Sequence, residues 1–285
     1  MGITKAVIPV AGRGTRLLPA TKSQPKEMLP IGRKPIVQYV VEELAEAGLD
    51  NILFVTGRKK RSIEDHFDYN PELGDISPGD NALSHLSMFY IRQANQQGLG
   101  DAISYAEKFV GDDSFAVALG DSVIRSGSHS SLLKRMMDIH QMEGAGATVA
   151  FMEVDEENVK KYGIAKPKGR AGASFEVEAL IEKPLPSEAP SRLAVAARYV
   201  FDPVIFEALR RTPAGRKGEL EITDAMSTLI KMGRKVIGVK LRKDEHRYDV
   251  GGFESYFKAF LDFALEDPEY GYMIRQYMRL KLHEV

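Results

Sequence analysis

The 285-residue chain contains no cysteine. Disulfide bonds, a thiol nucleophile and a cysteine-ligated metal are therefore excluded. No apolar run approaches the roughly 20 residues that a membrane-spanning helix needs. The N-terminus opens directly on a short strand-like run, so we expect no signal peptide. The expected lack of a signal peptide and of a membrane span makes a cytoplasmic protein without a membrane partner the default prediction.

An excess of charge of one sign is missing too. The net charge is −1 and the pI about 6.6. Proteins that bind nucleic acids or membrane surfaces usually carry a basic excess, so we expect no nucleic-acid partner. The six histidines show no metalloprotease spacing and are predicted to be non-catalytic. With no long linker or repeat, we predict one domain covering residues 1–285.

What the chain does contain is a regular alternation of short apolar runs with helical patterns in its N-terminal half. Such alternation predicts an α/β fold, with a mixed, mainly parallel sheet of Rossmann-like type flanked by helices. The predicted strands are Ala6–Ala11, Ile52–Thr56, Phe89–Arg92, Phe115–Leu119 and Ala147–Val154, and the predicted helices are Pro35–Gly48, Ser62–Phe67, Leu99–Phe109 and Ser131–Met142.

The pattern changes after Asp155, where charged and glycine-rich turns separate strand-like pieces at Phe175–Ile181 and Ala194–Phe201. These pieces predict a small antiparallel insertion beside the main sheet. The predicted elements that follow are helices at Pro203–Arg211 and Glu221–Met232, a strand at Val236–Leu241, and two C-terminal helices within Phe253–Leu282 that break near Pro268.

The most informative segment is PVAGRGTRLLPATKSQPKEMLP, residues 9–30, which follows the first strand. Gly12 and Gly14 allow close backbone approach, and consecutive N–H groups can then hold an anion. Arg16 can bind phosphate oxygens in a fork, and Lys26 adds a point charge. For a bare GxGxR motif, a plain glycine-rich surface turn is the favoured interpretation.

Two named phosphate loops do not fit this segment. The dinucleotide motif GxGxxG requires a third glycine where Leu17 stands, which disfavours a nicotinamide-dependent dehydrogenase. The P-loop ends in Gly-Lys-Ser/Thr, and no glycine in this chain precedes a lysine. A phosphate loop here is therefore of another type.

The longer stretch GRGTRLLPATKSQPKEMLPIGRKPIVQY resembles the signature of the bacterial UTP–glucose-1-phosphate uridylyltransferases, which are sugar nucleotidyltransferases. The G-x-G-T-R portion is shared by thymidylyl, adenylyl and guanylyl relatives, whereas PATKSQPKEMLP is more particular to the uridylyl branch. The similarity extends along nearly the full chain. It implies transfer of a uridylyl group from UTP to glucose 1-phosphate, giving UDP-glucose and pyrophosphate.

The resemblance also implies a uracil pocket. Gln93 and Gly98, in the run QANQQGLGD, match the glutamine and glycine that read the ring in the family. An amide fits a donor–acceptor edge, and a glycine lets backbone groups approach it. The backbone at Ala11 and Gly12 and the carboxylate of Glu27 would complete the pocket, although Glu27 fits a solvated loop acid equally well.

Mg²⁺ is the implied cofactor. Asp121 ends the run FAVALGD, where an aspartate also commonly caps a turn, and Asp249 lies in RYDVGG. Mg²⁺ prefers a few carboxylates together with phosphate oxygens. The resemblance pairs these two aspartates as metal ligands. Ser122 stands where the family often has a second acid.

A sugar-binding set is implied in the second half of the chain. Glu182 would bind sugar hydroxyls, Lys183 the sugar phosphate, and Gly163 and Ala197 would line the sugar. The family commonly has glycine where Ala197 stands, which puts the sugar specificity in question. Thr223 and Asp224, in ELEITD, fit the family pattern, but helix N-capping is the favoured interpretation for both.

In the implied reaction a phosphate monoester, with a second pKa near 6, attacks the α-phosphorus of UTP and needs no general base. Lys183 would hold the sugar phosphate, Arg16 the departing pyrophosphate, and Lys26 would lie near the triphosphate. We divide the chain into a nucleotide-binding part, 1–125, a sugar-binding part, 126–252, and C-terminal helices, 253–285.

Three alternatives stay open: use of dTTP, use of another sugar 1-phosphate, and a non-catalytic paralogue that binds UDP-sugars. A homo-oligomer, either a dimer or a tetramer, is expected from the resemblance. Between Asp68 and Gln93 the chain is shorter than the family's charged helix, which would alter a lid or an oligomer contact.

Overall fold

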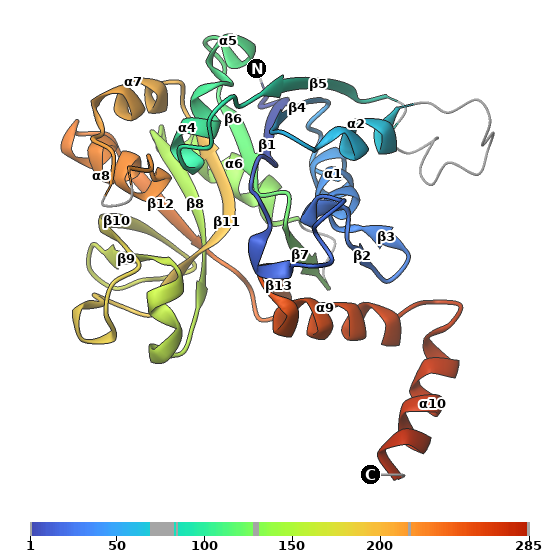
Figure 1. The fold of residues 1–285 in the computed structure, drawn as a ribbon. Coiled ribbons are helices and arrows are strands. Elements are labelled where there is room, and N and C mark those ends of the chain that lie inside the picture. The colour runs from blue at the N-terminus through green and yellow to red at the C-terminus, as the bar shows by residue number, and fades with distance from the viewer. Residues whose placement is uncertain (1, 69–82, 84, 128–130, 216–217, 284–285) are drawn as a thin grey trace.

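The computed structural model describes residues 2–68, 83, 85–127, 131–215 and 218–283. The unusual segment noted between Asp68 and Gln93 therefore lies largely outside the described residues. Nine strands form the main sheet of the described chain, in the order β5-β4-β1-β6-β11-β8-β12-β10-β9. Helices cover both of its faces (Figure 1), which confirms the predicted α/β class.

The strands of this sheet are β1 (Lys5–Pro9), β4 (Asn51–Thr56), β5 (Ser87–Arg92), β6 (Phe115–Ala118), β8 (Ala147–Glu153), β9 (Gly163–Pro167), β10 (Ser174–Glu182), β11 (Leu193–Phe201) and β12 (Val236–Lys240). Among the described strands, only β11 and β10 run against the others. The carboxyl ends of the remaining strands thus meet at one edge, where α/β sheets bind their ligands.

One predicted strand lies elsewhere than expected. The sequence pattern predicts Ala194–Phe201 within the antiparallel insertion, but β11 runs through the middle of the main sheet, between β6 and β8. Its nine residues are all buried, as a strand covered on both faces requires. The antiparallel piece is instead formed by β10 and β9, which extend the sheet at its far edge.

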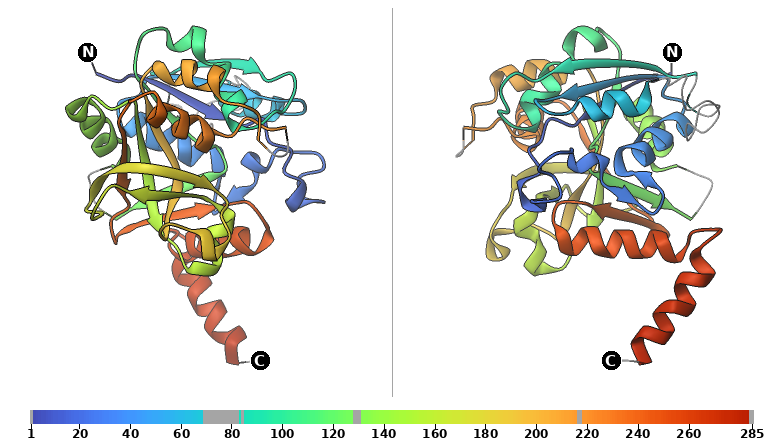
Figure 2. Two further views of the ribbon diagram at one scale, coloured as in Figure 1. Left: turned by 90° about the vertical axis from the view of Figure 1, so that its left-hand side faces the viewer. Right: turned by 45° about the vertical axis from the view of Figure 1, so that its right-hand side comes forward.

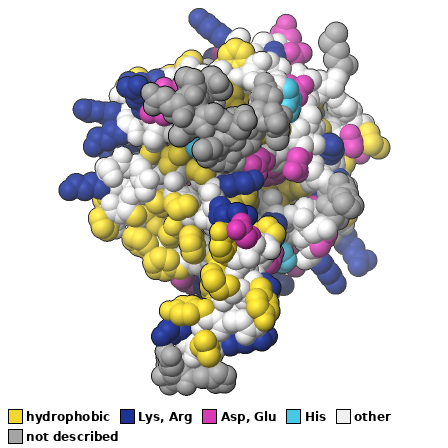
Figure 3. All heavy atoms as spheres, turned by 90° about the vertical axis from the view of Figure 1, so that its right-hand side faces the viewer, with side chains coloured by type: hydrophobic (Ala, Val, Ile, Leu, Met, Phe, Trp, Pro, Cys, Tyr) yellow, Lys and Arg dark blue, Asp and Glu magenta, His cyan; other side chains and the backbone are white. Residues whose placement is uncertain are grey.

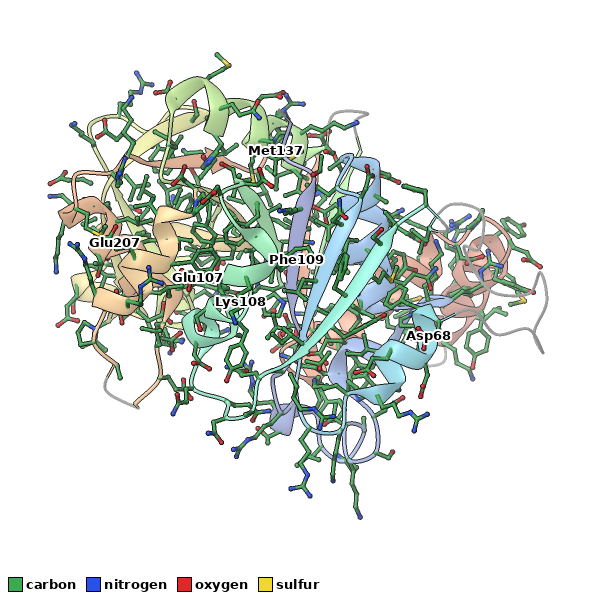
Figure 4. The ribbon with its side chains drawn as sticks, turned by 90° about the horizontal axis from the view of Figure 1, so that it is seen from above. Asp68, Glu107, Lys108, Phe109, Met137 and Glu207 are labelled. Carbon is green, nitrogen blue, oxygen red and sulfur yellow. The ribbon has the colours of Figure 1, made fainter. Side chains whose placement is uncertain are left out.

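Alternate residues of each strand face two separate cores. One core packs under α4 (Leu99–Ser104), α5 (Glu107–Val110), α7 (Val204–Arg211) and α8 (Ile222–Lys231). The other packs under α1 (Ile36–Glu46), α2 (Arg61–Phe67) and α6 (Leu132–Glu143). Seen from above in Figure 4, Met137 of α6 and Glu207 of α7 lie on opposite sides of the strands.

The predicted helix Leu99–Phe109 is wrong in extent, because α4 ends at Ser104 and α5 is a separate short helix.

Local sequence explains where the helices begin and end. The stripe Ile36, Val37, Val40, Val41 and Leu44 of α1 is fully buried. Beyond it, Gly48 adopts φ 85°, a conformation that ends a helix. The side chain of Ser131 caps α6 by accepting a hydrogen bond from the amide of Lys134 at 3.1 Å.

Two small sheets complete the fold and were not predicted. A short hairpin of β2 (Pro30–Ile31) and β3 (Lys34–Pro35) lies in the connection that leads to α1. A ribbon of β7 (Ser122–Ser126) and β13 (Glu245–Asp249) joins segments far apart in the sequence. This ribbon lies close to the ligand edge of the main sheet, where it positions the site.

The two predicted C-terminal helices are confirmed, with their break beside Pro268. They are α9 (Phe253–Leu265) and α10 (Gly271–His283). Helix α9 lies below the body of the protein, whereas α10 extends away from it in every ribbon view (Figures 1 and 2). No described helix is both long and apolar enough to cross a membrane.

Candidate active site

The β7–β13 ribbon brings Asp121 and Asp249 together. Asp249 pairs with Ser122 across the two strands, and the amide of Val250 donates to the carbonyl of Asp121 at 3.0 Å. The resemblance pairs these two aspartates, but sequence cannot show that they meet. The structure places both at the carboxyl-end edge of the sheet, because Asp121 lies in the short turn between the end of β6 and the start of β7.

Basic side chains surround this carboxylate pair. Lys26 forms an ion pair with Asp121, and Arg247 lies 3.2 Å from Asp249. Burial opposes ionisation of Asp121, but Lys26 outweighs it, so the pKa of Asp121 lies below its ordinary value. Burial, opposed by Arg247 and reinforced by Asp121, raises the pKa of Asp249. Despite burial, the charge of Asp121 raises the pKa of Lys26 to about 12, so Lys26 remains protonated at neutral pH.

A cavity of about 490 Å³ opens on one side of the carboxylate pair. It brings together seven of the predicted site residues: Ala11, Gly12, Lys26, Glu27, Gln93, Gly98 and Asp121. Gly14 lines neither this cavity nor the neighbouring one. With φ 65°, Gly14 instead shapes the turn, and its carbonyl accepts from the hydroxyl of Thr21 at 2.7 Å.

Gln93 is held in one orientation within this cavity. Its side-chain nitrogen donates to Asp101 at 2.5 Å and lies 3.4 Å from the carbonyl of Gly98. A carboxylate can only accept here, so the amide oxygen of Gln93 is left to accept a hydrogen bond from a ligand. Sequence reasoning missed Asp101, which lies in the first turn of α4.

Gly98 must be glycine for two reasons. It adopts φ 105°, and a Cβ atom at this position would lie 2.6 Å from the carbonyl oxygen of Leu220. Leu220 makes two backbone hydrogen bonds to the same turn. Its amide donates to the carbonyl of Gln97 at 2.7 Å, and its carbonyl accepts from the amide of Gly100 at 2.8 Å. The ELEITD segment therefore braces the turn that carries the predicted ring-reading residues.

Glu27 is not a solvated loop acid. It is 1% exposed and forms a buried ion pair with Lys60 at 2.7 Å. Burial raises the pKa of Glu27 and lowers that of Lys60, each against the attraction of the other. Sequence reasoning missed Lys60, because the residue precedes α2 and nothing in its local pattern links it to Glu27.

A second cavity of about 510 Å³ lies on the other side of the carboxylate pair. Leu99 and Leu119 line both cavities, so the two adjoin. The second cavity brings together the other predicted site residues: Arg16, Gly163, Glu182, Lys183, Ala197 and Asp249. Its predicted residues come mainly from β9, the end of β10, β11 and β13.

Gly163 forms a close wall of this second cavity. A Cβ atom there would lie 2.7 Å from the hydroxyl of Thr223 and 3.2 Å from a carboxylate oxygen of Glu182. The N-capping interpretation of Thr223 and Asp224 is wrong, because the N-cap of α8 is Glu221. Thr223 lies inside the first turn and lines the cavity instead.

Two residues of the second cavity have left-handed backbone conformations without being glycine. Lys183 has φ 47° and Ala197 has φ 59°. Such conformations cost of order 1–3 kcal/mol each and persist where the surrounding structure enforces them, often at functional sites. Lys183 is held by its amide, which donates to Tyr162 at 3.0 Å, and Ala197 by its carbonyl, which accepts from Leu119 at 3.2 Å.

Lys183 lies between two carboxylates of the second cavity. Its ammonium lies 2.5 Å from Glu182 and 3.9 Å from Glu221. Burial lowers the pKa of Lys183, but Glu182 outweighs it and raises the pKa overall. The site as a whole thus places two carboxylates between two adjoining cavities, each of which contains basic side chains.

Comparisons with known proteins agree with this geometry. A family profile described as nucleotidyl transferase matches residues 5–266. The UTP–glucose-1-phosphate uridylyltransferase of Staphylococcus epidermidis is 39% identical over 97% of this chain and 98% of its own length. The UTP–glucose-1-phosphate uridylyltransferase YngB of Bacillus subtilis is 43% identical over 94% of this chain and 91% of its own.

Solved structures give the same result. A UDP-glucose pyrophosphorylase complexed with UDP-glucose has a TM-score of 0.85 at 40% identity, covering 92% of this chain and 98% of its own. A UTP-bound UGPase from Acinetobacter baumannii has a TM-score of 0.86 at 35% identity, covering 97% and 98%. The chain therefore belongs to the nucleotidyl transferase family, in the group of the UTP–glucose-1-phosphate uridylyltransferases.

Proposed function

We propose that this protein transfers the uridylyl group of UTP to glucose 1-phosphate, forming UDP-glucose and releasing pyrophosphate. The observation that carries the proposal is the pair Asp121 and Asp249 at the junction of two adjoining cavities. One cavity takes the nucleotide and the other the sugar phosphate, so the two reacting phosphates meet beside the carboxylates.

In the nucleotide cavity, the fixed amide oxygen of Gln93 is an acceptor for the ring N–H of uracil. Backbone groups of Ala11, Gly12 and Gly98 approach the base, and buried Glu27 closes the pocket. We assign residues 1–125 to nucleotide binding and 126–252 to sugar binding. The two cavities support this division, although Glu219 lines the first and Arg16 the second.

In the sugar cavity, Glu182 and Thr223 face a polyhydroxylated ring across Gly163. Lys183 holds the sugar phosphate, and the release of its ammonium from Glu182 frees that carboxylate for the sugar hydroxyls. The methyl group of Ala197 narrows the same cavity. These contacts select a sugar phosphate over free phosphate.

The carboxylate pair fits a divalent cation. Within the described residues, no group of three or more metal-ligating side chains occurs. Two carboxylates completed by substrate phosphate oxygens are the ligand set that Mg²⁺ accepts. When bound by Asp121 and Asp249, Mg²⁺ would neutralise phosphate charge at the junction. Removal of Mg²⁺ by a chelator should abolish turnover and its return should restore it, whereas activity in excess chelator would contradict this assignment.

The proposed reaction needs no general base, because the sugar phosphate is mostly dianionic at neutral pH. One of its oxygens attacks the α-phosphorus of UTP in line, and the bond from that phosphorus to the bridging oxygen breaks as pyrophosphate leaves. Lys183 positions the nucleophile and Lys26 lies beside the triphosphate. Arg16 is assigned to the departing pyrophosphate, although it lines the sugar cavity near Asp249 and has to reach the leaving group across the junction. Positioning and charge neutralisation then supply the catalysis.

Pyrophosphate release tests the proposal directly. UTP and dTTP are each combined with glucose 1-phosphate and galactose 1-phosphate in the presence of Mg²⁺. We expect strong release only with UTP and glucose 1-phosphate. Release with another pair would retain the reaction and change the specificity. Binding of UDP-glucose without any release would instead identify a non-catalytic paralogue.

We further propose that the protein is a cytoplasmic homo-oligomer, a dimer or a tetramer. Helices α9 and α10 expose a set of large apolar side chains. Figure 3 shows hydrophobic side chains gathered over the lower part of the molecule, including the projecting C-terminal helix. The set consists of Phe257, Phe260, Leu261, Tyr272, Met273, Tyr277, Leu280 and Leu282. Exposed apolar surface on this scale favours covering by a second copy. Light scattering on the full chain should give a multiple of 31.6 kDa, and a monomer would contradict the proposal.

A further inference from the structure

Arg247 is a site residue that the motif analysis did not single out, although it lies in the RYDVGG stretch. Its side chain is only 7% exposed and lines the sugar cavity. The Nε atom donates to the hydroxyl of Ser122 at 2.8 Å, and Nη2 lies 3.2 Å from Asp249. The guanidinium carbon is 5.4 Å from the centre of the Tyr162 ring. These contacts fix the plane of the guanidinium.

One nitrogen of this group lacks a partner. Within the described part of the chain, Nη1 of Arg247 is buried and makes no hydrogen bond. A buried N–H donor without an acceptor is costly, and more so when the group is charged. Arginine has no neutral form at physiological pH that would relieve the cost. Because Arg247 lines the sugar cavity, an oxygen of a ligand bound there is a candidate for the missing acceptor.

The location of Arg247 indicates which ligand supplies the oxygen. Arg247 lines the sugar cavity and does not line the nucleotide cavity. The cavity also contains Arg16, Lys161 and Lys183. Of these, Lys183 lies between the carboxylates of Glu182 and Glu221. Arg247 therefore offers an unused, charged donor next to Asp249, where the sugar phosphate must approach.

We propose that Arg247 binds the phosphate of the sugar 1-phosphate through Nη1. This inference rests on the proposed function and adds a catalytic residue to it. Arg247 keeps Nη2 beside Asp249 and Nε on Ser122, so it links the phosphate to both strands of the β7–β13 ribbon. Its planar fork orients the phosphate, which a flexible ammonium does less well.

The test uses the full chain and the variants Arg247→Gln and Arg247→Lys. His246→Gln is the matched control, because His246 is the exposed neighbour on the same strand. Initial rates are measured against glucose 1-phosphate at saturating UTP and Mg²⁺, and UTP binding is titrated separately by calorimetry. In Arg247→Gln we expect kcat/KM for glucose 1-phosphate to fall by at least about tenfold, the effect of one charged hydrogen bond.

UTP affinity should stay within about twofold, and Arg247→Lys should lie between wild type and Arg247→Gln. Unchanged kcat/KM in Arg247→Gln, or an equal loss of UTP affinity, would overturn the inference. If Arg247→Gln does not fold, Arg247→Lys alone decides the outcome by the same two readouts. A purely structural role would lower the urea midpoint without changing kcat/KM for the sugar phosphate in the folded fraction.

A direct titration separates this inference from the proposed function. If the wild type releases no pyrophosphate from UTP and glucose 1-phosphate, the proposed function fails. Glucose 1-phosphate is then titrated into wild type and Arg247→Gln. A loss of at least about tenfold in the affinity of the variant would still support phosphate binding by Arg247. Equal affinities would overturn it.

Discussion

Asp249 lies directly across an antiparallel ribbon from Ser122, the residue that follows Asp121. Neither strand belongs to the main sheet, and the two are connected by most of the C-terminal half of the chain. The hydrogen bond from Val250 to the carbonyl of Asp121, at 3.0 Å, locks the two segments together. The position of the carboxylate pair therefore depends on correct folding of the whole domain.

Asp121→Asn and Asp249→Asn should each reduce kcat by at least about 10²-fold, because each change removes a charge from the proposed cation site. Asp244→Asn is the control, since Asp244 is an exposed residue just before β13. Steady-state pyrophosphate release measures the effect, and circular dichroism checks the fold. Near-normal turnover in either site variant would remove these aspartates from the mechanism.

Lys183→Ala should also lower kcat/KM for glucose 1-phosphate by at least about 10²-fold, since it deletes the ammonium proposed to hold the nucleophile. UTP binding should be nearly unchanged, because Lys183 does not line the nucleotide cavity. Lys166→Ala is the control, as Lys166 is an exposed lysine in β9 that pairs with Glu178 at 2.7 Å. A loss of UTP affinity equal to the loss in rate would contradict the assignment.

Gly98→Ala should destabilise the protein and abolish nucleotide binding. The new methyl group would lie 2.6 Å from the carbonyl oxygen of Leu220, in addition to the strain of φ 105°. Gly111→Ala isolates the strain, because Gly111 has φ 62° but nothing within 4 Å of its Cβ position. Urea unfolding should show Gly98→Ala as the more damaging change by about 1–3 kcal/mol. Equal losses of stability in the two variants would mean that Leu220 moves to make room for the methyl group without destabilising the protein.

Local sequence patterns were sufficient for most of the α/β frame. The strand β1, the buried stripe of α1 and the break beside Pro268 all follow from periodicity and turn chemistry. The pattern did not place Ala194–Phe201, because a buried strand has the same apolar sequence pattern in an insertion as in the centre of a sheet. It also missed the β7–β13 ribbon, whose short polar strands pair only through tertiary structure.

For the site, too, some residues could be predicted from the sequence and others could not. The resemblance identified residues that lie together in two cavities, including the two aspartates. It gave no indication of Asp101, Lys60 or Arg247, because no linear motif records their contacts with Gln93, Glu27 and Asp249. The left-handed backbone at Lys183 was equally hidden, because lysine carries no local signal for it.

A buried histidine should make stability depend on pH. His140 is 3% exposed and bonded to the hydroxyl of Thr148 at 3.1 Å, and burial lowers its pKa from 6.5 to about 4. The folded state thus disfavours the charged form. The contribution of His140 is fully present above pH 6.5 and is lost as the pH falls towards 4, a change of up to about 3 kcal/mol.

His140→Gln should remove this dependence, because glutamine does not titrate. Urea unfolding between pH 7.5 and 4.5 should give a steeper fall in stability for the wild type than for His140→Gln. His246→Gln, which changes an exposed histidine, should follow the wild type. Identical slopes for all three proteins would show that His140 titrates normally in the fold.

Ala197 offers a test of both stability and sugar choice. Its φ of 59° is strained for alanine, and its methyl group lines the sugar cavity. Ala197→Gly relieves the strain, which is worth about 1–2 kcal/mol, but adds freedom to the unfolded chain. We expect a small net gain of about 0.5 kcal/mol in the free energy of unfolding.

The neighbouring Ala196→Gly is the control for that gain, because Ala196 is fully buried and has no positive φ. Ala196→Gly should lower the free energy of unfolding by about 1 kcal/mol, because glycine within a strand is destabilising. The wider cavity of Ala197→Gly should also raise the ratio of kcat/KM for galactose 1-phosphate to that for glucose 1-phosphate, measured by pyrophosphate release. If both variants lose stability alike, Ala197 is not strained. If the ratio does not change, its methyl group does not restrict the sugar.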